Sequence, residues 1–326
     1  MDGEFDLIAR YFAPLAQGAP GADGLCNDAA LFEPNRREDL VLTLDTMVEG
    51  VHFLPDDPPD LIGRKLLRVN LSDLAAMGAR PRGYLLSTAF AGAPEAAWLE
   101  SFTAGLAADQ REFGLVLLGG DTVATPGPLT LTVVALGEVP RAKALRRGGA
   151  RAGDRIYVSG TIGDGALGLR VLRGELTRLP ARAGAALAER YRLPRPRVAL
   201  GRALAEGGLA SAALDISDGL IADLGHIARG SGLGAVIEAG RVPLSDPAKA
   251  ALAADPELRL AVLTGGDDYE LLFTVAPENG DAVAELALAL DLPLTQIGHM
   301  AKAEGLRVID ETGAPVPVPG GGWTHF

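Results

Sequence analysis

The chain has 326 residues, and 30 lysine and arginine residues against 42 aspartate and glutamate residues give it a formal charge of −12. A chain of this length is predicted to form about two domains, and a composition that is 48% hydrophobic and 22% charged is typical of a folded protein. The acidic excess argues against nucleic-acid partners and anionic membranes, because both recruit basic side chains.

The cellular location follows from three further features of the sequence. No stretch approaches the roughly 18 apolar residues of a membrane span, and residues 1–6 are acidic where an export signal would be basic. The single cysteine, Cys26, excludes an internal disulfide and fits a reducing compartment. We therefore predict a cytoplasmic protein, and we expect Cys26 to be buried as a small apolar residue.

Strand and helix patterns alternate along the first half of the chain. Short apolar or β-branched runs predict strands at 40–44, 84–90, 115–118 and 129–136. Helical spacing of apolar residues predicts helices at 61–77 and 94–114, where Gly78 and Gly114 act as stops.

A connector interrupts this alternation between residues 139 and 153, where proline, glycine and basic residues gather. The pattern then resumes, with strands predicted at 155–159, 213–216, 235–238 and 270–275 and helices at 165–172, 220–229 and 281–290. We therefore predict an α/β fold with an N-terminal domain at 1–138 and a C-terminal domain at 154–326.

Acidic residues stand where the predicted elements end. Asp45 and Asp121 are predicted to close strands, Asp215 and Asp218 flank a strand-to-helix turn, and Asp267 follows a Gly-Gly pair. Strand ends of an open α/β sheet line a crevice in which such folds bind ligands, so we expect these carboxylates to meet there. Each one alone also fits a turn residue or a helix N-cap, Asp218 above all.

Asp73 is harder to explain in this way, because it lies inside an otherwise apolar helical stretch. An unpaired carboxylate there would be costly to bury, and Asn70 offers a second oxygen on the same helix face. A shared requirement for oxygen ligands accounts for these positions together, and Mg²⁺ is the natural partner of such oxygens and of phosphates. With only four lysines in the chain, a polyphosphate would approach these acids through metal ions.

Other chemistries find no support in the sequence. There is no P-loop motif, and residues 160–165 lack the third glycine of a dinucleotide fingerprint. The four histidines have no zinc spacing, and no Ser-His-Asp or Cys-His set is present, so no covalent nucleophile is predicted. His52, just past the first predicted strand, fits a substrate contact or a structural role, whereas His226 is predicted to be structural.

Ten short motifs follow one another along the chain, together with the ending Trp323-Thr324-His325-Phe326. They are residues 3–5, 27–30, 43–46, 49–53, 69–79, 119–122, 147–154, 158–164, 215–220 and 265–270. In this order the motifs resemble the thiamine-monophosphate kinase family of the aminoimidazole ribonucleotide (AIR) synthetase superfamily. The segment Glu49-Gly50-Val51-His52-Phe53 and the Trp-Thr-His-Phe ending are similar to the thiamine enzyme rather than to its superfamily relatives. The resemblance covers nearly the whole chain, with Asn27 and Asp267 standing where the family usually has Asp and Glu.

This resemblance implies an AIR synthase-like fold of two α/β domains, whose N-terminal domains pair in a homodimer. It implies phosphoryl transfer from ATP, the co-substrate, to thiamine monophosphate, assisted by several Mg²⁺ ions. The implied metal ligands are Asp28, Thr43, Leu44, Asp45, Asp73, Asp121, Asp215 and Asp218. The implied ATP contacts are Gly120, Asp121, Arg147 and Ser217. The implied substrate contacts are His52, Asp267 and Trp323, the last by stacking on the cationic ring.

Two alternatives stay open at this point. One is another ATP-using enzyme of the superfamily, although Cys26 is poorly placed for the reactive cysteine of a selenophosphate synthetase. The other is a non-catalytic nucleotide-binding maturation protein of the same fold. The intact acids Asp45, Asp73, Asp121 and Asp218 favour an enzyme.

Overall fold

The computed structural model describes residues 4–318, which fall into two compact units. The first unit combines the chain up to Leu74 with Ala79–Ala142, and the second combines Ala75–Gly78 with the chain from Lys143 onward. The predicted substrate residue Trp323 lies outside the described residues.

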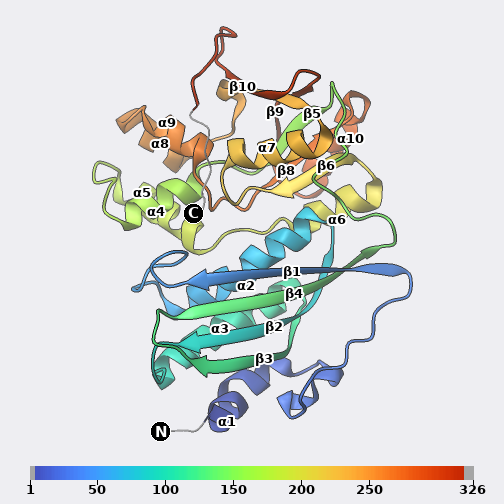
Figure 1. Ribbon diagram of the computed structural model, residues 1–326. Coiled ribbons are helices and arrows are strands. Elements are labelled where there is room, and N and C mark those ends of the chain that lie inside the picture. Colours follow the sequence, from blue (N-terminus) through green and yellow to red (C-terminus); the bar gives the residue numbers. More distant parts are fainter. Residues whose placement is uncertain (1–3, 319–326) are drawn as a thin grey trace. The chain divides into compact units, whose positions relative to one another are not determined.

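The first unit is built on a mixed four-stranded sheet of order β1-β4-β2-β3, in which only β2 and β3 run parallel (Figure 1). Its strands are β1 (Glu38–Val48), β2 (Arg80–Phe90), β3 (Val116–Ala124) and β4 (Thr130–Pro140). Its helices are α1 (Glu4–Leu7), α2 (Pro59–Ala76) and α3 (Ala96–Phe113), with short turns of helix at Ile8–Phe12, Ala13–Ala16 and Pro20–Leu25.

The strands of this sheet run further than the sequence predicted. β1 continues through Asp45 to Val48, and β3 continues through Asp121 to Ala124. The prediction that these two aspartates close their strands is therefore wrong. The strands go on because the following residues, among them Thr46 and Val123, favour extended backbone and pair with the neighbouring strands.

Helices α2 and α3 cover one face of this sheet (Figure 1). They approach closely, since a Cβ at Gly105 of α3 would lie 2.1 Å from the Asp60 carbonyl oxygen of α2. Buried apolar side chains such as Leu66, Leu74 and Phe102 fill the space between helices and strands. The opposite face keeps exposed leucines, which Leu42 exemplifies at 62% exposure.

The second unit contains a six-stranded sheet of order β10-β7-β9-β5-β8-β6. Its strands are β5 (Arg155–Ser159), β6 (Ala210–Asp215), β7 (Gly234–Glu238), β8 (Leu271–Val275), β9 (Leu294–Ala301) and β10 (Gly305–Ile309). Its helices are α4 (Asp164–Leu172), α5 (Ala181–Arg192), α6 (Val198–Gly207), α7 (Leu220–Ser231), α8 (Asp246–Ala254), α9 (Leu258–Thr264) and α10 (Gly280–Ala289). Every strand and helix predicted for this half is present, whereas α5, α6, α8, α9, β9 and β10 were not predicted.

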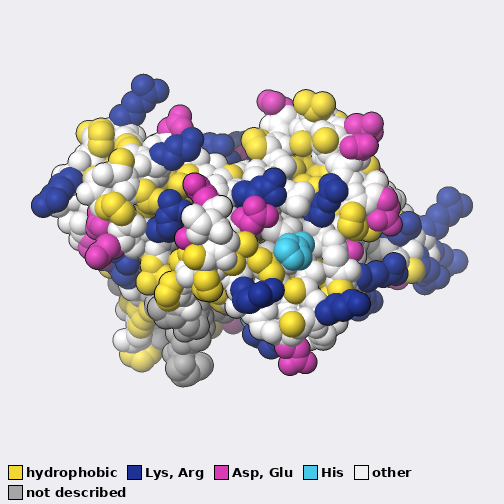
Figure 2. Space-filling view, turned by 90° about the horizontal axis from the view of Figure 1, so that it is seen from above, with side chains coloured by type: hydrophobic (Ala, Val, Ile, Leu, Met, Phe, Trp, Pro, Cys, Tyr) yellow, Lys and Arg dark blue, Asp and Glu magenta, His cyan; other side chains and the backbone are white. Residues whose placement is uncertain are grey.

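Cys26 is exposed, so the expectation that it is buried is wrong; it lies in an irregular stretch between the last N-terminal helical turn and β1. On the face shown in Figure 2, basic and acidic side chains are interspersed with hydrophobic ones. No helix in the described part of the chain is long and apolar enough to cross a membrane.

Candidate functional site

Three of the predicted metal ligands meet in the first unit, between β1 and α2. The Thr43 hydroxyl donates a hydrogen bond to Asp73, and Asp45 lies close enough to Asp73 for the two carboxyl groups to interact directly. Strand alternation places residues 43 and 45 on the helix-covered face, and Asp73 stands in the last turns of α2. The structure therefore places the helical Asp73 beside two other oxygen-bearing side chains.

The two neighbouring carboxyl groups, Asp45 and Asp73, influence each other's charge. Burial, followed by the negative charge of Asp73 and a hydrogen bond with it, raises the pKa of Asp45 from 3.8 to about 7. Among the residues that the structure describes, no lysine or arginine forms an ion pair with Asp45. Two adjacent carboxylates at neutral pH are a donor set that a hard divalent cation stabilises.

A buried amide near this group supports the same conclusion. The Asn70 side chain is fully buried, and its Nδ2 donates to the Leu66 carbonyl oxygen at 3.0 Å. Its Oδ1 has no hydrogen-bond partner among the described residues. A buried oxygen in this state is the kind of atom that a bound water or cation satisfies, so the residues present here fit Mg²⁺.

The opposite face of the same sheet carries a second part of the predicted site. A cavity of about 570 Å³ is lined by Asp28, Gly120, Asp121 and apolar residues of the sheet and the N-terminal segment. Register places Gly120 opposite Leu86 and Asp121 opposite Ser87, so that Asp121 and Asp45 point to opposite faces. The expectation that all these acids meet at one sheet edge is therefore wrong for a single chain.

His52 follows β1 in a tight turn. Its Nδ1 accepts the backbone N–H of Val48 at 3.1 Å, and its carbonyl oxygen accepts from Lys65 Nζ at 3.0 Å. Because Nδ1 accepts, the neutral ring carries its proton on Nε2. The half-buried ring is thus held in place by the backbone of β1.

In the second unit, two loops bring further predicted residues together. The backbone N–H groups of Asp267 and Tyr269 donate to the carbonyl oxygens of Ser217 and Ile216, at 2.9 and 2.8 Å. A Cβ at Gly266 would lie 2.0 Å from the Ser217 oxygen, so the glycine permits this approach. Asp267 therefore stands beside the loop that follows β6.

That loop follows Asp215, carries Ser217 and leads into α7. Asp215 is the last residue of β6, at the strand-to-helix turn that the sequence predicted, and its side chain is buried. Asp218 is not the N-cap of α7: the cap position is Gly219, with no side-chain hydrogen bond. The carboxylate of Asp218 is thus not used to cap α7.

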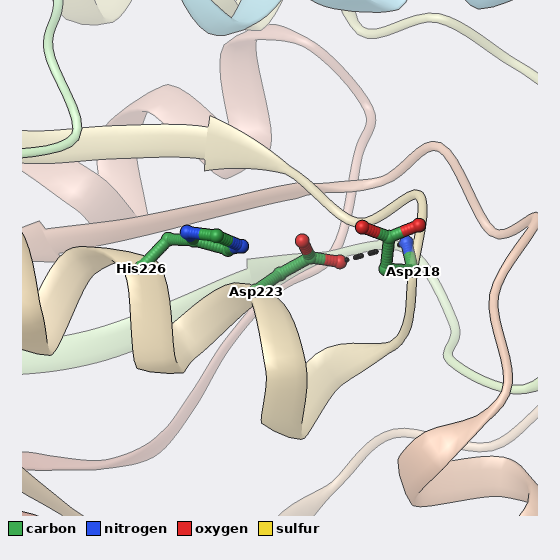
Figure 3. Close-up of side chains that lie close together, drawn as sticks. All are labelled: Asp218, Asp223 and His226. Carbon is green, nitrogen blue, oxygen red and sulfur yellow. Dashed lines mark hydrogen bonds between the residues drawn. The ribbon is translucent and has the colours of Figure 1, made fainter. Parts of the chain in front are cut away.

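Two residues that sequence reasoning did not assign to the site lie beside Asp218. Atoms of Asp218, Asp223 and His226 lie within 4.8 Å of one another, and Figure 3 shows both α7 side chains directed toward Asp218. Burial, then the charge of Asp218, raises the pKa of Asp223 to about 7. An acid and a histidine at positions 4 and 7 of α7, on one helix face, were the available signal.

The ring of His226 lies near basic side chains as well. Its Nδ1 lies 3.2 Å from Nη2 of Arg229, which can only donate, so the neutral ring carries its proton on Nε2. Burial, then the charges of Arg229 and Arg147, lowers the pKa of His226. The predicted ATP contact Arg147 is exposed and lies close enough to influence this ring. His226, predicted to be structural, is thus part of the polar cluster.

The remaining predicted position is Leu44, whose side chain is 59% exposed on the outer face of β1. Its side chain offers no ligand atom, so only its backbone oxygen could bind a metal.

Two compact α/β units with clustered carboxylates define the class of this protein. The family model of the AIR synthase related protein N-terminal domain matches residues 26–139, and that of the C-terminal domain matches residues 151–311. The chain is 44% identical to the thiamine-monophosphate kinase of Caulobacter vibrioides, over 99% of this chain and 90% of that protein. It belongs to the thiamine-monophosphate kinase family of AIR synthase related proteins.

Solved structures agree with this assignment. The crystal structure of the thiamine-monophosphate kinase of Stenotrophomonas maltophilia K279a is 45% identical, with a TM-score of 0.79 over 87% of this chain and 89% of that one. A structure described as AaThiL complexed with AMPPCP and TMP is 32% identical, with a TM-score of 0.78 over 99% of this chain and 97% of that one.

Proposed function

We propose that this chain transfers the γ-phosphoryl group of ATP directly to thiamine monophosphate, giving thiamine diphosphate and ADP. The full-length identity of 44% to a thiamine-monophosphate kinase carries this proposal. It is supported by the relative described as binding AMPPCP and TMP together, since a nucleotide and an acceptor bound at once suit a direct transfer.

Within the first unit, Thr43, Asp45 and Asp73 would hold Mg²⁺ on one face of the sheet, and Asp28 and Asp121 would do so on the other. Asp215 and Asp218 would serve in the second unit, and the Leu44 carbonyl would add a backbone oxygen. Several Mg²⁺ ions, when bound, supply charge neutralisation for the phosphates and for the oxygens of the transfer. The acidic side chains of the chain would determine where these Mg²⁺ ions are held.

The nucleotide contacts are proposed from both units. A Cβ at Gly120 would lie 1.9 Å from the Leu86 oxygen, so only glycine keeps this stretch of β3 flat and its backbone open to a phosphate. In the second unit, the exposed guanidinium of Arg147 and the hydroxyl of Ser217 would donate to ATP oxygens.

The acceptor contacts are proposed to be His52, Asp267 and Trp323. His52 would donate from Nε2 to a phosphate oxygen, because Nδ1 is already occupied by Val48. Asp267 would offer its carboxylate to the cationic ring system of thiamine. Trp323 would stack on that ring. In-line attack by the acceptor phosphate requires no protein nucleophile, which matches the absence of a catalytic Ser, Cys or His set in the sequence.

We also propose a homodimer formed through the outer face of the first sheet. Leu40, Leu42, Leu44 and Leu85 are 41%, 62%, 59% and 40% exposed on this face, which is unusual for a monomer surface. Asp121 points from the same face, so a second copy seated there would lie beside it. Leu42→Asp is expected to produce monomers in sedimentation velocity, and an unchanged dimer would exclude this face. The cytoplasmic location stays a prediction.

The reaction is tested by ADP release with ATP, Mg²⁺ and thiamine monophosphate. ADP that depends on the phosphorylated acceptor, together with thiamine diphosphate in the product, supports the proposal. Equal ADP with unphosphorylated thiamine contradicts it. Nucleotide binding without any acceptor-dependent ADP would favour the non-catalytic alternative.

A further inference from the structure

We propose that Asp223 is a positioning residue, which fixes Ser217 and Asp218 so that the loop between β6 and α7 can bind Mg²⁺ and nucleotide. This inference rests on the proposed function, because that function gives Ser217 and Asp218 their ligands. Asp223 itself has no role in the sequence-based assignment.

The geometry behind the proposal is a single carboxylate oxygen that accepts three backbone N–H groups. Oδ2 of Asp223 lies 3.1 Å from the nitrogen of Ser217 and 3.0 Å from each nitrogen of Asp218 and Gly219. The residue is only 4% exposed, so these bonds are sheltered from water. Three hydrogen bonds to one sheltered oxygen hold the loop against the helix.

The loop needs this anchor because α7 has no ordinary N-terminal cap. Gly219 occupies the cap position with φ 123° and ψ 147°. Because glycine has no side chain, it provides no oxygen to accept the free N–H groups of the first turn. A Cβ at this position would lie 2.5 Å from the Thr264 oxygen, which excludes the usual capping residues. Asp223, inside the first turn of α7, reaches back and accepts the backbone N–H groups of the cap residue Gly219 and of the two residues before it, so it ties the loop to the helix.

The consequence for the site is a fixed direction for the side chain of Asp218. With Oδ2 occupied by the loop, the other oxygen of Asp223 faces the space shared with Asp218 and His226 (Figure 3). A ligand-bearing loop held by a buried partner loses affinity when that partner is removed, by about 10–100-fold in comparable metal sites. We expect a loss of this size from Asp223.

Three substitutions separate positioning from charge. Asp223→Asn keeps an oxygen that can accept the three N–H groups but loses the charge. Asp223→Glu keeps the charge but moves the oxygen by one methylene, and Asp223→Ala removes the acceptor. If Asp223 acts by positioning the loop, the Asp223→Asn variant should bind Mg²⁺–AMPPCP with an affinity within about threefold of the wild type. The Asp223→Glu and Asp223→Ala variants should bind it about 10–100-fold more weakly, as measured by calorimetry.

Amide hydrogen exchange of the ligand-free protein provides the second readout. The amides of residues 217–219 are expected to exchange at least about tenfold faster in the Glu and Ala variants, and at nearly the wild-type rate in Asn. Asp154→Asn is the matched control, since Asp154 is also buried and accepts a backbone N–H, from Arg151, in the same unit. It is expected to change neither the affinity nor the exchange of residues 217–219.

The outcomes are distinguishable. The proposal would be overturned if the Asp223→Asn variant bound Mg²⁺–AMPPCP weakly while the Asp223→Glu variant bound it nearly normally, because the charge and not the position would then matter. Unchanged amide exchange of residues 217–219 in both the Asp223→Glu and the Asp223→Ala variant would also overturn it. If the wild type binds Mg²⁺–AMPPCP but does not phosphorylate thiamine monophosphate, the proposed function fails while the binding series still decides the role of Asp223. A wild type that binds no Mg²⁺–AMPPCP overturns both.

Discussion

Replacing Asp73 by asparagine should make the metal-free protein respond differently to pH. Burial and the charge of Asp73 raise the pKa of Asp45 from 3.8 to about 7, so the fold favours the protonated form of Asp45. The stability that Asp45 contributes is therefore fully present below about pH 4 and is lost as the pH rises through about 7. Asp73→Asn removes one cause of the raised pKa, so the variant should lose less stability on going from pH 5 to pH 8.

The size of the effect follows from the pKa difference. A rise from 3.8 to about 7 corresponds to about 4 kcal/mol at about 1.4 kcal/mol per pH unit. Burial is the largest cause and Asp73 the second, so the charge of Asp73 accounts for the smaller share, about 1–2 kcal/mol. The variant should therefore gain about 1–2 kcal/mol relative to the wild type between pH 5 and pH 8. Added Mg²⁺ should reverse the order at pH 8, because it stabilises the wild type more.

Urea unfolding at both pH values, with EDTA and then with Mg²⁺, measures both effects. Comparing the two pH values within each protein cancels other consequences of the substitution. Asp246→Asn is the control, since the Asp246 side chain is 94% exposed, and it should show no such pH-dependent difference. A stability difference between Asp73→Asn and the wild type that is the same at pH 5 and pH 8 would refute the reasoning.

Three further predictions concern other parts of the first unit. Gly120→Ala should lower the unfolding temperature and weaken AMPPCP binding in calorimetry, because its Cβ would lie 1.9 Å from a backbone oxygen; Gly119→Ala, which meets only a side-chain carbon at 3.3 Å, should be tolerated. Asp109→Ala should cost about 3–5 kcal/mol in urea unfolding, because it removes the buried carboxylate from two buried or half-buried arginines and leaves them the 48% exposed Glu112; a cost below about 1 kcal/mol would contradict this. His52→Asn, which can still accept from Val48 but lacks the ring Nε2–H, should raise KM for thiamine monophosphate about tenfold and spare kcat in steady-state kinetics.

The sequence predicted the local surroundings of several site residues correctly. Asp73 lies in an apolar helix beside other side-chain oxygens, and Asp215 ends a strand. Both features depend on neighbours along the chain, which apolar periodicity and turn residues make visible. The AIR synthase-like fold was expected from motif order and is confirmed.

What the sequence did not reveal depends on pairing and on distant contacts. The lengths of β1 and β3 are decided by neighbouring strands, so Asp45 and Asp121 could not be placed within a strand from local pattern alone. Their opposite faces follow from the register across β4 and β2, which a single strand does not contain. The role of Asp223 was hidden because an acid in the first turn of a helix is common for reasons of helix dipole alone.

Acids of this chain differ in what surrounds them. Two buried acids away from the proposed site face arginines: Asp109 lies 2.8 and 2.7 Å from Arg64 and Arg68, and Glu270 lies 3.0 Å from Arg190 and is also paired with Arg197. Four acids of the proposed site face one another instead, in the pairs Asp45 with Asp73 and Asp218 with Asp223.

This division gives the net charge of −12 a structural meaning. An arginine beside each site carboxylate would stabilise the fold at neutral pH, since it would lower the raised pKa values of Asp45 and Asp223. It would also occupy the oxygens and the space that a cation and a phosphate require. Under the proposed function, bound Mg²⁺ would offset the free-energy cost of grouping like charges, so stability and ligand binding should be linked at these positions. Substituting arginine partners into either pair should therefore raise stability without metal and abolish the Mg²⁺-dependent gain.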